Sequence, residues 1–197
     1  MTDPINIFNE NWNKSKSLQD PNAQFCFLAT ATNNQGASLR TLVLREVKDD
    51  KFLIFINSTS PKWHELESSE HCELLVFWPT LMQQYRIRGR YNPVPEEFMR
   101  ACWNDKPYAS KLIDHFYFRH QGQSSTIPSR EVLTQAIEEL KLKYPKNAEV
   151  PFVPSAKGVE VVPTSIEVWI GVDEDRLHDR ALYTKSGSGW DKKILVP

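Results

Sequence analysis

The spacing of apolar residues along the chain changes near residue 24 from a helical to an alternating pattern. Ile5, Phe8 and Trp12 recur at close to helical spacing, so we predict a helix over residues 5–18 that Pro21 terminates. From there onward apolar and polar positions alternate, as expected for strands with one buried face. This alternation predicts, in order, a strand at 24–32, a turn at 33–36, a strand at 37–47 and a strand at 52–57.

The middle of the chain mixes helices with strands. Ser60 followed by Pro61 is typical of a helix start, because serine caps the first turn and proline fits its first position. The predicted helices cover residues 62–69, 95–104, 107–118 and 129–144, and the predicted strands cover 72–78 and 83–91. The proline-rich stretch 145–163 is interpreted as a surface crossing, and three closing strands are predicted at about 158–172, 176–184 and 190–196.

This order of elements predicts a mainly β fold with additional helices. Hairpins at both ends of the chain would form an antiparallel sheet that curls into a barrel, with the helices packed outside it. The 197 residues contain no internal repeat or low-complexity tract. We therefore expect a single domain over residues 1–197, with an N-terminal helical segment at 1–20.

Composition narrows the function classes. The net charge of −1 disfavours a general nucleic-acid binder, and the short apolar runs disfavour a membrane span. The seven glycines form neither common glycine-rich phosphate loop, so side chains would have to hold a bound phosphate. The three cysteines lack C-x-x-C spacing and the chain starts without a secretory signal, which predicts a cytoplasmic protein without disulfides. The histidine spacings match no metal pair, and we assign no metal.

The densest polar segment is Arg176-Leu177-His178-Asp179-Arg180. On a strand, Arg176, His178 and Arg180 would point to one side, where three donors suit a ligand with ring heteroatoms and acid groups. Spacing alone favours the simpler interpretation, which is a charged outer face of an edge strand.

Three other basic features each allow two interpretations. Gln84 and the arginines at 86, 88 and 90 share one strand face, which is typical of a solvated or subunit-contacting surface. Arg40 and Arg45 lie on opposite faces of their strand, so one of them needs either an anionic ligand or a carboxylate partner. Lys62, near a predicted helix start, is either an anion-binding residue or an exposed lysine.

With these segments in place, the sequence resembles the pyridoxamine 5′-phosphate oxidase family of FMN-dependent split-barrel proteins. Arg176 to Arg180 reproduces the family's Arg-Leu-His-Asp-Arg segment in full. Further matches are the strand Arg40 to Arg45, Ser60-Pro61-Lys62, Gln84 with Gly89, Gln123-Ser124-Ser125, Ile166 to Trp169 and the ending Trp190 to Pro197. The resemblance implies a six- to eight-stranded antiparallel split β-barrel with peripheral helices, in which residues 158–197 form a dimerisation and substrate region.

The resemblance also implies roles for individual residues. Arg176 and His178 would be the catalytic residues that contact the pyridine ring of the substrate. Arg45, Lys106 and Ser110 would hold the substrate phosphate, and Arg40 and Lys62 the FMN phosphate. The remaining contacts to FMN, shared by both subunits of a homodimer, would come from Thr41, Leu42, Val43, Leu44, Gln84, Gln123, Ser124, Trp169 and Arg180.

The implied activity is oxidation of pyridoxine or pyridoxamine 5′-phosphate to pyridoxal 5′-phosphate, with hydride transfer to FMN and reoxidation by O₂. Four positions depart from the family's pattern: Pro61 replaces an arginine, Arg45 a lysine, Cys102 a tyrosine and Lys106 an arginine. Each lost charge-assisted hydrogen bond costs about 1.5–3 kcal/mol. Two alternatives therefore stay open, a flavin oxidoreductase of this fold with another substrate and a non-enzymatic FMN-binding dimer.

Overall fold

The computed structural model describes residues 3–32, 36–172 and 176–197, so the turn predicted at 33–36 lies almost entirely outside the described residues. The chain divides into two compact units, each with its own buried apolar residues. The barrel unit contains the chain up to Ile54 together with Ser68–Asn92 and Glu160–Pro197. The helical unit contains Phe55–Glu67 and Pro93–Val159. A single domain over residues 1–197 stays a prediction.

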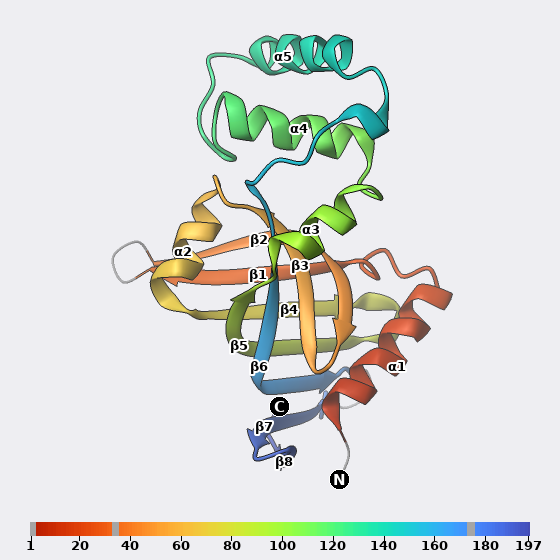
Figure 1. The fold of residues 1–197 in the computed structure, drawn as a ribbon. Coiled ribbons are helices and arrows are strands. Elements are labelled where there is room, and N and C mark those ends of the chain that lie inside the picture. Colours follow the sequence, from red (N-terminus) through yellow and green to blue (C-terminus); the bar gives the residue numbers. More distant parts are fainter. Residues whose placement is uncertain (1–2, 33–35, 173–175) are drawn as a thin grey trace. The chain divides into compact units, whose positions relative to one another are not determined.

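The barrel unit is built on a sheet whose strands, among the described residues, follow the order β3-β2-β1-β4-β5-β6-β7-β8. The strands are β1 (Phe25–Thr32), β2 (Gly36–Lys48), β3 (Lys51–Asn57), β4 (His71–Trp78), β5 (Gln83–Pro93), β6 (Ala156–Ile170), β7 (Asp179–Ser186) and β8 (Gly189–Ile194). A short 3-10 helix, η1 (Pro79–Leu81), joins β4 to β5. Because β3 also pairs with β6, six strands close an antiparallel barrel, and the hairpin β7–β8 extends from β6 (Figure 1). The predicted split barrel of six to eight antiparallel strands is confirmed.

Alternation along β4 and β5 explains how these strands face the core. Leu74, Val76 and Trp78 are buried, whereas the residues between them are only half-buried. On β5 the same period buries Tyr85 and leaves its neighbours more exposed. Gly89 is required on this strand because a Cβ would lie 2.1 Å from the carbonyl oxygen of Val162 on β6. The two strands therefore approach too closely for any side chain at that point.

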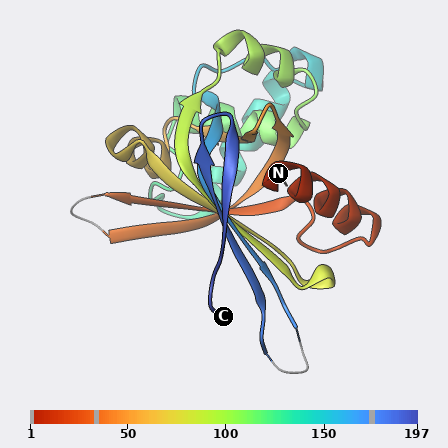
Figure 2. The ribbon, with the colours of Figure 1, turned by 90° about the horizontal axis from the view of Figure 1, so that it is seen from below.

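The N-terminal helix α1 (Pro4–Ser17) packs against the strands of the barrel unit (Figures 1 and 2). Phe8 is fully buried, and its ring centroid lies 5.0 Å from Phe52, 5.1 Å from Trp78 and 5.0 Å from Tyr85. Burial of one such side chain contributes about 1.5–3 kcal/mol. The helical periodicity of the first residues thus predicted both the element and its buried face.

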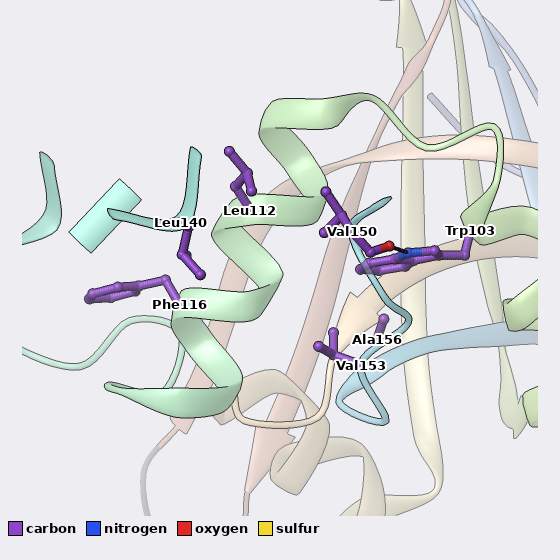
Figure 3. Packing of buried hydrophobic residues seen from close by; sticks show 7 residues of the cluster. All are labelled: Trp103, Leu112, Phe116, Leu140, Val150, Val153 and Ala156. Atoms are coloured by element: carbon purple, nitrogen blue, oxygen red, sulfur yellow. Dashed lines mark hydrogen bonds between the residues drawn. The ribbon is translucent and has the colours of Figure 1, made fainter. Parts of the chain in front are cut away.

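The helical unit contains α2 (Pro61–Ser69), α3 (Glu96–Trp103), α4 (Tyr108–Arg119), α5 (Arg130–Lys143) and the short 3-10 helix η2 (Asn147–Glu149). Its core is formed by Trp103, Leu112, Phe116, Leu140, Val150, Val153 and Ala156 (Figure 3). None of the helices in the described residues combines the length and apolar character that a membrane crossing requires.

The interpretation of residues 145–163 as a surface crossing is wrong for much of this stretch. Val150, Val153 and Ala156 are buried in the core of the helical unit, and β6 already begins at Ala156. The carbonyl of Val150 also accepts a hydrogen bond from Trp103 Nε1 over 2.9 Å (Figure 3). Pro151 and Pro154 interrupt any helix in this segment. The apolar residues Val150, Val153 and Ala156, which are spaced three apart, nevertheless pack into the core.

Candidate functional site

The β6–β7 connection gathers three of the predicted site residues. Trp169 and Arg180 are directly opposite in the β6–β7 register, and His178 immediately precedes β7. The ring centroids of Trp169 and His178 lie 4.8 Å apart, with an interplanar angle of 55°. Gly171 leaves the space for the indole, since a Cβ there would lie 2.8 Å from Trp169 Cη2. Trp169, His178 and Arg180 therefore form a preorganised group, which we call the β6–β7 group.

One backbone contact fixes the ring of His178. The amide of Val172 donates to His178 Nδ1 over 3.0 Å. A backbone amide can only donate, so Nδ1 carries no proton in this arrangement. In the neutral imidazole the proton then lies on Nε2, which is the nitrogen able to donate to a ligand.

Arg176 and His178 do not lie on a strand, which corrects the sequence prediction. β7 begins only at Asp179, and Arg176 has a left-handed backbone with φ of 60°. This conformation, together with the packing of His178 on Trp169, breaks the alternation that a strand would impose. The side chain of Arg176 is exposed. The structure therefore brings His178 and Arg180 together around Trp169, and leaves Arg176 outside a shared strand face.

Arg180 belongs to a charged cluster that crosses four strands. Its Nη2 donates to Glu167 Oε1 over 2.7 Å, and the other oxygen of Glu167 accepts from Arg86 Nη1 over 3.2 Å. Glu73 accepts from Arg86 Nε over 2.7 Å and from Arg88 Nε over 3.1 Å. We call these five residues the arginine cluster.

The arginine cluster has more positive than negative charge, because three arginines share the carboxylates of Glu73 and Glu167. The Glu167 side chain is only 13% exposed, so it is a largely desolvated acceptor. The hydrogen bond to Glu73 is the main cause that raises the pKa of Arg86 above its ordinary value, against the opposing effect of burial. The cluster therefore keeps a net positive charge, which can attract an electron-rich or anionic ligand.

Arg180 also lines a groove of about 390 Å³ in the barrel unit. Apolar side chains supply much of the remaining wall, namely Ile7, Val168, Ile170, Tyr183 and Ile194. The second terminal nitrogen of Arg180 donates to the carbonyl of Val196 over 3.1 Å. Asp179 and Lys192 line it as well, so the groove combines an apolar wall with charged groups, which is a common form of small-molecule site.

The two faces predicted for β5 are confirmed. Gln84 is half-buried on the face that carries Arg86 and Arg88, while Tyr85 and Ile87 are buried on the other. The arginine face is not simply solvated, since it binds carboxylates of β4 and β6.

The opposite orientations predicted for the two arginines of β2 agree with their exposure. Arg40 is half-buried and Arg45 is exposed. Arg40 Nη1 donates to the carbonyls of Leu28 and Ser38, each over 3.3 Å, and to the hydroxyl of Thr30. These acceptors are neutral, so these hydrogen bonds do not cancel the charge of the guanidinium. Between the two arginines exposure falls along the strand: Thr41 is exposed, Leu42 and Val43 are half-buried, and Leu44 is buried.

In the helical unit, Lys62 lies in the first turn of α2 and is only 8% exposed. Its Nζ donates to Gln123 Oε1 over 2.8 Å. The backbone amide of Gln123 donates to Thr59 Oγ1 over 3.0 Å. Gly122 allows this close packing, because a Cβ there would lie 2.9 Å from the carbonyl oxygen of Thr59. The sequence predictions for Lys62 and Gln123 thus fall on residues in direct contact, and the exposed Ser124 follows in the same loop.

These residues suit the phosphate of a cofactor. A buried lysine in the first turn of a helix provides a charged donor that a phosphate accepts. The site needs no glycine-rich loop, in agreement with the absence of those motifs from the sequence.

Lys106 and Ser110, the predicted substrate-phosphate residues, flank the start of α4 in the helical unit. The Nζ of Lys106 forms an ion pair with the carboxylate of Asp114, which is one of the buried residues of α4. The other oxygen of Asp114 accepts from Asn57 Nδ2 over 3.2 Å. Lys106 is therefore already bound to an anionic group of the protein itself.

The carboxylates that hold these cations were missed from the sequence. Glu167 could have been found, because it lies two residues before Trp169 on a predicted strand and shares its face. Glu73 meets the arginines of β5 only through the β4–β5 register. Asp114 follows Lys106 by eight residues and lies on α4, whereas Lys106 precedes this helix. No rule of sequence spacing predicted that these two residues form a pair.

Comparisons with known proteins identify the family of this chain. Residues 18–144 match the family model described as pyridoxamine 5′-phosphate oxidase, and residues 157–197 match the one described as the pyridoxine 5′-phosphate oxidase C-terminal dimerisation region. The pyridoxine/pyridoxamine 5′-phosphate oxidase of Pelagibacter ubique is 33% identical over 198 residues, which cover 99% of this chain and 92% of that protein.

Two solved structures share the fold over almost the whole chain. PhzG from Burkholderia lata, solved in complex with tetrahydrophenazine-1-carboxylic acid, has a TM-score of 0.88 and 25% identity, and the match covers 100% of this chain and 94% of that one. A pyridoxamine 5′-phosphate oxidase-related, FMN-binding protein from Nostoc punctiforme has a TM-score of 0.76 at 18% identity, covering 98% of this chain and 96% of that one, and supports the fold alone. The barrel, the two family models and the near full-length relative together show that the chain belongs to the pyridoxamine 5′-phosphate oxidase family of oxidoreductases.

Proposed function

We propose that this protein is an FMN-dependent oxidase that converts pyridoxine or pyridoxamine 5′-phosphate to pyridoxal 5′-phosphate with O₂ as the electron acceptor. The observation that carries the proposal is the β6–β7 group, in which the His178 ring packs on Trp169 and accepts from the Val172 amide, and Arg180 is held by Glu167. A preorganised set of donors beside an aromatic ring suits a planar heterocycle.

FMN would be held by residues that fit its two chemical parts. Lys62, which is buried in the first turn of α2, and Arg40, which is half-buried on β2, would bind the phosphate. Gln84, Gln123, Ser124, Trp169 and Arg180, with Thr41 to Leu44 of β2, would contact the remainder. When bound, FMN supplies the hydride acceptor and passes the electrons on to O₂.

The substrate would be oriented by the residues around the β6–β7 connection. His178 would donate from Nε2, since Nδ1 is occupied by the Val172 amide. Arg176 would supply a second cation from its exposed position. Arg45, Lys106 and Ser110 would hold the substrate phosphate. Together these contacts would position the carbon that loses the hydride, which is the main contribution that protein side chains make to such a reaction.

We further propose that the active protein is a homodimer with shared FMN sites. The match of residues 157–197 to a dimerisation region supports this assembly. Exposed apolar side chains in that segment, including Ile194 and Leu177, are consistent with a surface that another subunit covers.

A second candidate function has one specific observation in its favour. Lys106 is paired with Asp114, so its charge is offset before a substrate phosphate arrives. A flavin oxidase acting on a reduced ring system with a carboxylate, the type of ligand seen in the PhzG structure, needs less positive charge at this position.

The proposed function is tested by mixing the FMN-loaded protein with pyridoxamine 5′-phosphate without oxygen and following flavin absorbance near 450 nm. We expect bleaching, recovery when air is admitted, and formation of pyridoxal 5′-phosphate. A flavin that stays oxidised with both B6 phosphates, but is bleached by a dihydroaromatic carboxylic acid, would favour the second candidate. A bound flavin that no donor reduces would indicate a flavin-binding role.

A further inference from the structure

The ion pair between Lys106 and Asp114 is a feature that the family resemblance did not suggest. The two side chains are 19% and 9% exposed, so solvent screens the pair only in part. Asp114 projects from the middle of α4, while Lys106 lies in the turn that precedes this helix. The pair therefore joins α4 to the turn that carries Lys106, one of the proposed substrate-phosphate residues.

Asp114 is held from a second direction, which keeps its carboxylate in place. Asn57 at the end of β3 donates to Asp114 Oδ1, and its amide nitrogen also lies 3.4 Å from Ser155 Oγ. The Asn57 side-chain oxygen accepts from the amide and the hydroxyl of Thr59, over 3.0 and 2.7 Å. Asp114 cannot swing away without breaking this network, so the carboxylate stays near Lys106 when a ligand approaches.

Lys111, a second lysine on α4, does not provide an additional accessible positive charge for a ligand. Lys111 is only 2% exposed, and its Nζ donates to the carbonyls of Asn104 and Asn147 over 3.4 and 3.3 Å. Burial lowers the pKa of Lys111 below its ordinary value. Its ammonium is turned to backbone carbonyls, and the cation with the better access to a ligand is Lys106.

We infer that Asp114 is a specificity-determining residue, which lowers the affinity of the Lys106 position for a doubly charged phosphate relative to a singly charged or neutral group. The inference rests on the proposed function insofar as Lys106 is taken to contact the substrate's anionic group. A carboxylate bound to the lysine repels an incoming anion, and this repulsion is about twice as large for a phosphate dianion as for a carboxylate. Two of the three Nζ donors remain for a ligand, so binding is weakened and not abolished.

The test compares two unreactive ligands that differ only in the phosphate, 4-deoxypyridoxine 5′-phosphate and 4-deoxypyridoxine. Binding to the FMN-loaded protein is measured by titration calorimetry, which does not depend on turnover. We expect Asp114→Asn to bind the phosphorylated ligand about tenfold more tightly, as expected for removing one nearby charge in a partly screened site, and the dephosphorylated ligand within twofold of wild type.

A second variant protects the test against misfolding of Asp114→Asn. Lys106→Arg keeps a partner for Asp114, while its planar fork presents further N–H groups to a phosphate. We expect this variant also to bind the phosphorylated ligand more tightly. Glu138→Gln on α5 is the matched control, because it removes an exposed carboxylate from a lysine pair in the same unit, and it should leave both affinities unchanged.

The outcomes separate this inference from the proposed function. Lys106→Met should weaken the phosphorylated ligand if Lys106 contacts the phosphate. Suppose that Lys106→Met weakens binding of the phosphorylated ligand. The role of Asp114 is then refuted if Asp114→Asn and Lys106→Arg leave the preference between the two ligands unchanged, or if Asp114→Asn tightens binding of both ligands equally. In either case the placement of the phosphate at Lys106 stands. If Lys106→Met has no effect on either ligand, the placement of the phosphate at Lys106 is refuted together with the inference.

Discussion

The arginine cluster of the barrel unit and the Lys106–Asp114 pair of the helical unit use carboxylates in different proportions. In the arginine cluster, Glu167 is shared by Arg86 and Arg180, and three arginines share two glutamates in total. In the helical unit one lysine meets one aspartate. The first arrangement fixes its cations and keeps excess positive charge, while the second fixes its cation by offsetting the charge.

This difference shows why a count of basic residues does not identify an anion site. Arg180 and Lys106 were both predicted to bind ligands because of their residue type and position. Their carboxylate partners decide how much of each charge a ligand experiences. The comparison predicts that variants of Arg180 and Glu167 in the arginine cluster change cofactor binding and folding, whereas variants of the lysine pair change the preference among substrates.

The largest effect is expected for Arg180→Ala. The variant removes a cation that is held in place by Glu167 and lines the apolar groove. Loss of one charge-assisted hydrogen bond costs about 1.5–3 kcal/mol, which corresponds to FMN binding that is about 10- to 150-fold weaker. The dissociation constant is measured by the quenching of FMN fluorescence on titration with the apoprotein.

Arg88→Ala is the matched control for this measurement. Arg88 is in the same cluster but its side chain is 64% exposed and it contacts Glu73, not Glu167. An exposed ion pair contributes about 0–1 kcal/mol, so this variant should bind FMN as wild type does. Equal losses in both variants would mean that the overall charge of the cluster matters and the position of Arg180 does not.

A smaller effect, on folding, is expected when the shared carboxylate is replaced. Glu167→Gln keeps one acceptor oxygen but turns an N–H donor toward one of its two arginines. We expect the free energy of unfolding to fall by about 2–3 kcal/mol, because a partly buried guanidinium loses its charged partner. In Asp114→Asn one lysine loses its charged acceptor, whereas in Glu167→Gln two arginines do, so the expected loss is smaller, about 1–2 kcal/mol.

Urea unfolding of the two variants in one buffer measures this difference. The unfolding slopes should match that of wild type, which shows that the same surface is exposed. If Asp114→Asn is the less stable of the two, the sharing of a carboxylate does not explain the difference between the regions.

The fold was largely predictable because its barrel is built from residues that alternate. The pattern in β4 and β5 and the helical spacing of Phe8 and Trp12 depend on local sequence, and they located these elements correctly. The stretch after Pro145 was misassigned because its buried residues follow no strand or helix period, and only packing against α3 to α5 of the same unit shows that they are core.

The candidate site was less predictable, since its geometry depends on contacts between distant residues. The resemblance selected Arg180 and Lys106, but their partners Glu167 and Asp114 became evident only from the structure. The alternation assumed for Arg176 to Arg180 failed because His178 turns onto Trp169 and accepts a hydrogen bond from Val172. Such side-chain contacts override the strand period that sequence alone indicates.

The smallest effect concerns His115, which follows Asp114 on α4. His115 is buried, and one ring nitrogen lies 2.8 Å from the carbonyl oxygen of Pro151, which requires a proton on Nε2. Burial is the main cause that lowers the pKa of His115 below its ordinary value of 6.5, and the charges of Arg119 and Lys143 act in the same direction. The hydrogen bond to Pro151 and the charge of Asp114 oppose this shift.

The sign of the resulting pH dependence follows from the proton binding of the two states. Above pH 6.5 the imidazole is neutral whether the protein is folded or unfolded, so it adds no pH dependence there. Below pH 6.5 the unfolded chain takes up a proton that the folded state resists, so stability is lost as the pH falls toward the lowered folded pKa, by at most about 1.4 kcal/mol per pH unit. His115→Gln retains a donor for Pro151 without this titration, so its unfolding free energy should change less than that of wild type between pH 7.5 and 5.5. Identical pH profiles of the two proteins would show that the loss of stability in acid comes from groups other than His115.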